Sequence, residues 1–128
     1  MRYLLDTHAA LWGAEDDERL GAAARKALLG CAPGDVAICE ITLLEIVTLA
    51  KKRRVQFEIS LPEYLKRLQV LYPPVHIEPG AAARAMDLPL PDGDLFDRVI
   101  VAAAVEHQLT LITRDSHITQ SRLVPTLW

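Results

Sequence analysis

The first indication of the fold comes from the segment Tyr3-Leu4-Leu5-Asp6-Thr7-His8-Ala9-Ala10-Leu11-Trp12. Its first three residues are apolar in succession, without the polar alternation of a half-exposed strand. Continuous apolar runs are typical of strands buried on both faces, as in a parallel sheet that helices cover. Asp6 or Thr7 then offers a cap for a short helix through Trp12. The segment therefore predicts a buried strand that leads directly into a helix.

The same alternation of apolar runs and helical patterns continues along the chain. Further strands are predicted at residues 36–39, 75–77 and 110–113, and a last short one within 123–128. Helices are predicted at residues 20–29, 41–54, 61–72, 80–87 and 94–108, with a loop at 88–93. We therefore expect an α/β fold, a single domain over residues 1–128 with a mainly parallel central sheet flanked by helices.

Composition restricts the class of protein. The 128 residues are 51% hydrophobic and carry 14 Lys plus Arg against 17 Asp plus Glu, a formal net charge of -3. Such a chain is long enough to bury its own core and too hydrophobic to be disordered. A protein that binds nucleic acid usually has a basic surplus, so basic groups that contact RNA or DNA must be local here.

No export or membrane segment is expected. Asp6 interrupts the first apolar run too early for a signal peptide, and no run of about 18 uncharged apolar residues follows. Cys31 and Cys39 have neither CxxC spacing nor a neighbouring His cluster, and Cys39 ends a predicted buried strand. We therefore expect a protein without a membrane partner, in the reducing cytoplasm.

Four carboxylates occupy positions that suggest a site. Asp6 and Asp115 each follow a predicted strand, where ligands bind in open α/β sheets. Asp97 lies near the start of the predicted helix 94–108, with Asp94 one turn earlier on the same face. Glu45 lies on an apolar helical stripe with no Lys or Arg three or four residues away. A lone buried carboxylate is costly, so Glu45 needs a cation, a hydrogen-bond network or water.

A divalent cation held by Asp6, Glu45, Asp97 and Asp115 would supply that charge. Mg²⁺ and Mn²⁺ prefer oxygen ligands from a few carboxylates and water. Thr7 and Thr113 stand beside the acids and could orient them. Each residue also has an ordinary explanation. Helix caps or turns would explain Asp6, Thr7 and Asp115, and strand propensity would explain Thr113. Asp97 could form an ion pair with Arg98, and Glu45 could point outward into solvent. The prediction therefore rests on the four acids together.

The one dense basic run is Lys51-Lys52-Arg53-Arg54, at the end of the predicted helix that carries Glu45. A solvated helix end is its ordinary explanation, and a patch that contacts phosphate is the functional alternative. Arg98 and Arg114 each adjoin a predicted ligand and could face incoming phosphates. For His8 we favour a polar residue of the first helical turn over a proton carrier.

Three segments resemble PIN-domain ribonucleases, and more specifically VapC-type toxins of type II toxin–antitoxin systems. They are residues 3–12, residues 44–52, and residues 95–104 together with 111–115. The resemblance implies a PIN-like nuclease domain and a Mg²⁺- or Mn²⁺-dependent endoribonuclease with the ligands Asp6, Glu45, Asp97 and Asp115. It also implies an RNA substrate, a VapB-like antitoxin that blocks the site, and a homodimer. Close relatives carry His-Arg-Asp-Pro where this chain has Asp92-Gly93-Asp94-Leu95, so a basic substrate contact is absent there.

Two other functions stay open at this point. A PIN-like domain could bind RNA or a protein partner without cleaving it. A haloacid-dehalogenase-like phosphatase would use Asp6 as a nucleophile, but that chemistry needs a second acid two residues later, where this chain has His8. The leading hypothesis is hydrolysis of RNA by bound metal, which activates water and offsets phosphoryl charge. On this hypothesis RNA binding needs metal, because the proposed ligands are acidic.

Overall fold

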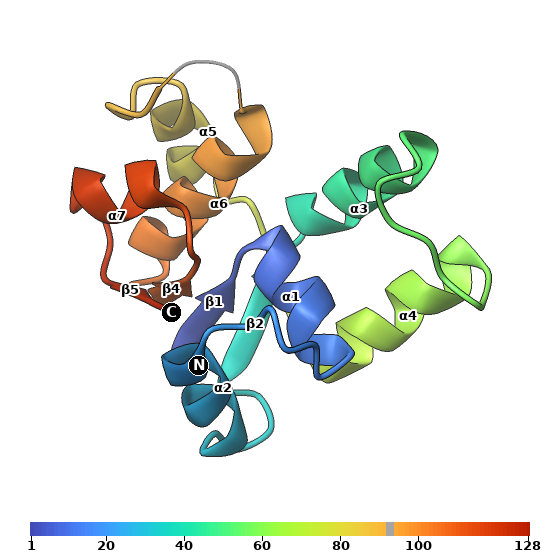
Figure 1. Cartoon of the computed structure of the whole chain (residues 1–128). Coiled ribbons are helices and arrows are strands. Elements are labelled where there is room, and N and C mark those ends of the chain that lie inside the picture. Colours follow the sequence, from blue (N-terminus) through green and yellow to red (C-terminus); the bar gives the residue numbers. More distant parts are fainter. Residues whose placement is uncertain (92–93) are drawn as a thin grey trace.

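The central feature of the computed structural model is a parallel sheet with strand order β3-β2-β1-β4-β5 (Figure 1). The structure describes residues 1–91 and 94–128, and within these the sheet has five strands. They are β1 (Tyr3–Leu5), β2 (Val36–Cys39), β3 (Pro74–Val75), β4 (Thr110–Ile112) and β5 (Thr126–Leu127). The predicted α/β fold with a parallel central sheet is therefore confirmed.

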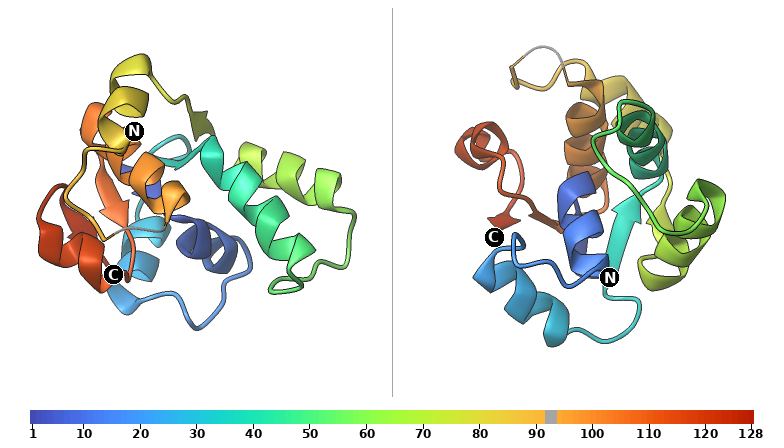
Figure 2. Two further views of the ribbon diagram at one scale, coloured as in Figure 1. Left: turned by 90° about the horizontal axis from the view of Figure 1, so that it is seen from above. Right: turned by 45° about the vertical axis from the view of Figure 1, so that its right-hand side comes forward.

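Helices cover both faces of this sheet, as Figure 2 shows in two further views. Leu4 of β1 faces a core built with α5 and α6, whereas Leu5 faces a core built with α1 and α4. Both leucines are fully buried, which explains the continuous apolar run. The helices are α1 (Thr7–Ala14), α2 (Ala22–Leu29), α3 (Ile41–Lys51), α4 (Leu61–Leu71), α5 (Pro79–Ala85), α6 (Leu95–Glu106) and α7 (Ser116–Ser121).

Strand register brings distant parts of the sequence to one edge of the sheet. Leu5 pairs with Ile38 on one side and with Ile112 on the other. One residue further, the Asp6 N–H donates to the carbonyl oxygen of Ile112 at 3.1 Å. The residues that follow β1 and β4 therefore meet at the carboxyl edge, as expected for neighbouring parallel strands.

The basic run differs from its prediction as the end of a helix. Helix α3 ends at Lys51, with Lys52 as its C-cap. Arg53 has a φ of 58°, in the left-handed region that breaks an α-helix. Lys52, Arg53 and Arg54 are therefore exposed residues of a turn after α3, not of its last helical turn.

Other boundaries also differ. The third strand occupies Pro74–Val75 instead of residues 75–77, because the Ile77 N–H donates to the side chain of Glu40 at 2.7 Å. Pro74 is tolerated since β3 is an edge strand. Helix α7 has no counterpart in the prediction, since only Ile118 of its six residues is buried and no apolar period marks it. Two residues of the predicted loop 88–93, Asp92 and Gly93, lie outside the described residues.

The cysteines are both free. Cys39 is fully buried at the end of β2, as predicted, and burial raises the pKa of its thiol to about 11. In the described part of the chain, none of the helices is long and apolar enough to cross a membrane.

Candidate acidic active site

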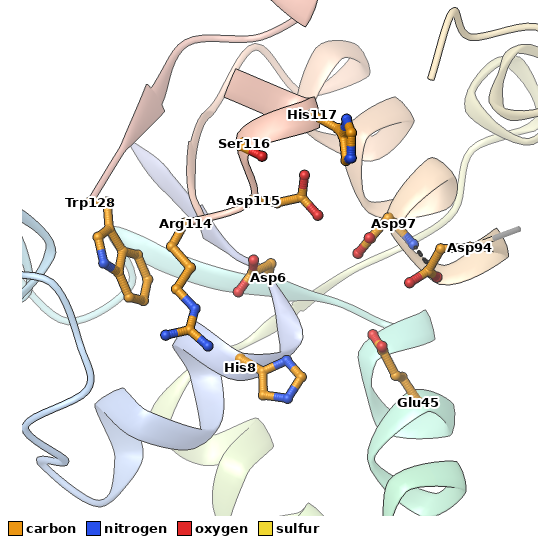
Figure 3. Close-up of a pocket in the computed structure, with 10 residues that line it drawn as sticks. All are labelled: Asp6, His8, Glu45, Asp94, Asp97, Arg114, Asp115, Ser116, His117 and Trp128. Atoms are coloured by element: carbon orange, nitrogen blue, oxygen red, sulfur yellow. Dashed lines mark hydrogen bonds between the residues drawn. The ribbon is translucent and has the colours of Figure 1, made fainter. Parts of the chain in front are cut away.

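A cavity of about 420 Å³ lies at the carboxyl ends of β1 and β4 (Figure 3). The carboxylates of Asp6, Asp97 and Asp115 face a common space, and Glu45 reaches toward it from α3. All four predicted metal ligands and the supporting residue Asp94 line this cavity. The remaining lining residues are His8, Arg114, Ser116, His117 and Trp128.

Asp6 is held in place by the helix that follows it. Its Oδ1 accepts a hydrogen bond from the Ala9 N–H at 2.9 Å and caps α1. Asp115 caps α7 in the same way, through the Ile118 N–H at 3.1 Å, and its own N–H donates to the Thr113 hydroxyl. Each cap uses one carboxylate oxygen, so capping is compatible with a ligand role for the other.

Asp94 and Asp97 are fixed relative to each other at the start of α6. Asp94 is the N-cap, and its Oδ1 accepts from the Asp97 N–H at 3.1 Å. Both side chains line the cavity from the same first turn. The ion pair between Asp97 and Arg98 that the sequence left open is not formed, because Arg98 has other partners, described below.

Glu45 faces inward, from the middle of α3. The hydroxyl of Thr7 donates a short hydrogen bond to its Oε1 and also lies 3.5 Å from the Thr42 hydroxyl. Thr7 and Thr42 are buried, so this contact fixes the carboxylate at the wall of the cavity. Burial raises the pKa of Glu45, the Thr7 hydrogen bond opposes that shift, and the charges of Asp94 and Asp6 add to it.

The cavity carries more negative charge than its own groups neutralise. Burial raises the pKa of Asp97 to about 8, assisted by Asp94, Glu45 and Asp115. Burial also raises the pKa of Asp6, against the hydrogen bonds from Thr113 and the Ala9 N–H. Raised carboxyl pKa values in one cleft are typical of functional sites. A cation in the cavity would favour the ionised form of these carboxyls and lower their pKa values.

The donor set suits Mg²⁺ or Mn²⁺. Among the described residues, no group of three or more His, Cys, Asp or Glu side chains is arranged so that it could hold a metal ion. Mg²⁺ does not require one, because it usually keeps several waters and contacts only one or two carboxylates. The cavity volume of about 420 Å³ leaves room for an ion with its waters, each of which occupies about 30 Å³. The residues present therefore fit a hydrated divalent ion.

The predicted basic contacts have different locations. Arg114 lines the acidic cavity, with its guanidinium 4.6 Å from the ring centroid of Trp12. Arg54 lines a neighbouring cavity instead. Lys51, Lys52 and Arg53 are exposed and do not line the acidic cavity.

The surroundings of Arg98 argue against the RNA contact that the sequence suggested for it. Its side chain is only 6% exposed. The guanidinium donates to the backbone carbonyls of Leu88 at 2.9 Å and Leu90 at 2.5 Å, and more weakly to that of Ala85 at 3.3 Å. Arg98 thus holds residues 85–91, at the end of α5 and after it, and this structural role accounts for its side chain.

Two lining residues, Ser116 and His117, were not predicted from the sequence, and a third, His8, was considered there but not assigned to the site. Ser116 and His117 begin α7, which has too short an apolar pattern to be predicted. The signal was Asp115 followed by Ser116 directly after a strand, a pattern typical of a helix start. His8 is exposed in the first turn of α1 and reaches the cavity.

Fold and site together define an α/β domain whose acidic cavity lies at the carboxyl ends of its central strands. The PIN domain family model matches residues 3–122, so the chain belongs to the PIN domain family. This assignment excludes the haloacid-dehalogenase-like phosphatase.

Within that family the chain is similar to Ribonuclease VapC22 of Mycobacterium tuberculosis. The two are 35% identical over 120 residues, which is 93% of this chain and 91% of the relative. A toxin–antitoxin complex from Klebsiella pneumoniae contains a chain of 26% identity and TM-score 0.64, with 95% and 94% of the chains covered. M. tuberculosis VapC20, described as a sarcin-ricin loop cleaving toxin, has the same fold, with a TM-score of 0.68 at 18% identity and coverage of 95% and 96%. The similarity to VapC22 makes this a VapC-type PIN protein.

Proposed function

We propose that this chain is the toxin of a toxin–antitoxin pair and a Mg²⁺- or Mn²⁺-dependent endoribonuclease, with residues 1–128 as its nuclease domain. One observation carries the proposal. Asp6, Glu45, Asp97 and Asp115 come from four separate segments and line one cavity of a PIN domain. The name of its relative VapC22, a ribonuclease, supports the same activity.

In the proposed mechanism, Asp6 and Asp97 would hold the ion directly, and Glu45 and Asp115 would hold it directly or through water. The ion would supply Lewis-acid chemistry, activating water and offsetting negative charge on the phosphate. Thr7 orients Glu45, the Thr113 hydroxyl supports Asp6, and Asp94 holds the backbone of Asp97. Asp97 would have to be ionised to act as a ligand, and its burial beside Asp94, Glu45 and Asp115, which raises its pKa to about 8, opposes that ionisation when no cation is bound.

RNA contacts follow from the same charge distribution. A cavity lined by five carboxylates repels a phosphate, so RNA binding should require the metal. We expect Arg114, at the cavity wall, and Arg54, in the wall of the neighbouring cavity, to contact phosphates. Lys51, Lys52 and Arg53 add an exposed basic surface after Glu45 on the same segment. Their contribution is to long-range attraction of the RNA.

The proposed partners are a VapB-like antitoxin and a second copy of the chain, in the cytoplasm. The similarity to a chain of a toxin–antitoxin complex supports the first, and a small upstream reading frame for a DNA-binding protein is its expected genetic sign. The side chains of Leu44 and Leu95 are each 55% exposed, on the contacting helices α3 and α6. We propose that these two leucines lie in the homodimer interface.

The test is cleavage-site mapping on total RNA with purified protein. We expect discrete cuts in Mg²⁺ or Mn²⁺ and none in a chelator, with cutting restored when excess metal is added back. Protein that binds RNA and leaves it intact across titrations of both metals would contradict the proposal and favour a binding module that does not cleave.

A further inference from the structure

A second cavity adjoins the acidic one. Its volume is about 380 Å³, and it lies between α1 and the segment that follows α3. The two cavities share His8 and Arg114 in their walls. A ligand that occupies the acidic cavity and extends past these two residues therefore enters the second one.

The two cavities have opposite charge. Five carboxylates and one arginine line the acidic cavity. Three arginines, Arg19, Arg54 and Arg114, line the second cavity together with one carboxylate, Glu15. A cation is favoured in the first and an anion in the second. A metal ion in the acidic cavity and an RNA phosphate in the second cavity would match these two charges.

Trp12 holds two of the arginines in position. The guanidinium carbons of Arg19 and Arg114 lie 5.1 and 4.6 Å from the centroid of its ring. Trp12 is only 5% exposed, so it is a fixed support. A guanidinium that stacks on an aromatic face keeps its N–H edge available for a carboxylate or phosphate.

Carboxylates of the protein neutralise only part of the positive charge of this cavity. Arg19 forms a bidentate ion pair with Asp17, with Nε–Oδ1 and Nη2–Oδ2 distances of 3.0 and 2.8 Å, so its Nε and Nη2 are already engaged and Nη1 is the nitrogen that would contact a phosphate. In the part of the chain that the structure describes, Arg54 and Arg114 have no carboxylate within ion-pair distance. Arg114 also directly precedes Asp115, so its backbone is tied to the acidic cavity.

We propose that the cavity formed by Arg19, Arg54 and Arg114 around Trp12 binds a phosphate of the RNA strand next to the one that is cleaved. The inference rests on the proposed function, because cleavage in the acidic cavity fixes where the neighbouring phosphate lies. It adds Arg19, which sequence reasoning did not single out, and separates Arg54 from the rest of the basic run. The ligand is a phosphodiester of single-stranded RNA.

The test combines a protein change with a matching RNA change. The variants are Arg54→Ala and Arg19→Ala, and Arg84→Ala is the control, since Arg84 is exposed on α5 and pairs with an acid, Glu106, as Arg19 does with Asp17. Substrates are a short RNA with one mapped cut site, and copies in which a neutral methylphosphonate replaces one phosphate beside that site. With the unmodified RNA we expect KM to rise about three- to fivefold in each test variant, with kcat nearly constant.

Two further readouts identify the interaction. The log–log dependence of binding on salt should become shallower by about 0.7 for each phosphate that the variant no longer neutralises. One methylphosphonate position should raise KM in the wild type and raise it by a smaller factor in Arg54→Ala, since the two changes share the contact between Arg54 and that phosphate. Unchanged KM and salt dependence in both variants, with a wild type that cuts RNA, would overturn this inference alone. A wild type that does not cut RNA would instead contradict the proposed function.

Discussion

Asp6→Asn is expected to lower the rate of RNA cleavage roughly 100-fold or more without unfolding the protein. Asn keeps an oxygen that can cap α1 through the Ala9 N–H, but it carries no charge for a metal. Loss of several kcal/mol of metal stabilisation corresponds to that scale, since about 1.4 kcal/mol changes a rate tenfold. Cleavage rates in saturating Mg²⁺, with circular dichroism melts of both proteins, measure the effect.

Asp35→Asn provides the matched control. Asp35 also accepts a backbone hydrogen bond, from the Ala32 N–H at 3.2 Å, but it precedes β2 at the opposite end of the sheet. We expect its cleavage rate to equal that of the wild type. Full activity in Asp6→Asn would refute the assignment of the site, whatever the control shows.

Asp97→Asn is expected to remove a pH dependence from the stability of the metal-free protein. The pKa of Asp97 is raised from 3.8 to about 8 in the folded state, so the folded protein binds this proton more tightly than the unfolded chain. Its contribution is fully present below about pH 4 and is lost as the pH rises toward 8. In a chelator, the Tm of the wild type should therefore fall by several degrees between pH 5 and 8, and that of Asp97→Asn by less.

Metal should change this comparison. Mn²⁺ favours the ionised carboxylate, so it should raise the Tm of the wild type most at pH 8 and raise that of Asp97→Asn less. Asp87→Asn, an exposed change after α5, should behave as the wild type does. Equal pH profiles of wild type and Asp97→Asn in chelator would show that Asp97 is not the carboxyl whose proton the cavity retains.

The central sheet could be predicted from the sequence because the local hydrophobic pattern and the tertiary packing agree there. Leu4 and Leu5 are both buried, on opposite faces of the sheet. The apolar run therefore predicts a buried strand even when the segments that pack against it are unknown. Asp6 and Asp115 could then be placed together, since parallel strands end at one edge. Glu45 was found because an acid on an apolar stripe needs a partner, which the structure supplies as Thr7.

What sequence reasoning missed depends on contacts between distant segments. Arg98 is adjacent to Asp97 in sequence, yet its guanidinium turns to carbonyls of the segment before α6. No local pattern distinguishes such a buried arginine from one that faces RNA. The cavity around Trp12 likewise joins α1, the turn after α3 and the residue after β4. No sequence pattern predicted a binding role for Arg19, because its position beside the Trp12 ring depends on the fold.

The net charge of -3 acquires a different meaning once the acids are located. Five of the 17 acidic residues line one cavity, and three arginines line the next. The acidic excess therefore does not oppose RNA binding uniformly over the surface. It is concentrated where a divalent ion would reverse its effect.

The central claim is that the acidic cavity binds the divalent ion needed for cleavage. A crystal structure grown with Mn²⁺, at a concentration that supports cleavage, tests this most directly through anomalous scattering of manganese. We predict an anomalous peak in the space faced by Asp6, Asp97 and Asp115, in coordination with at least two carboxylates of the four-acid set. Full occupancy elsewhere, with no peak in this cavity, would contradict the claim.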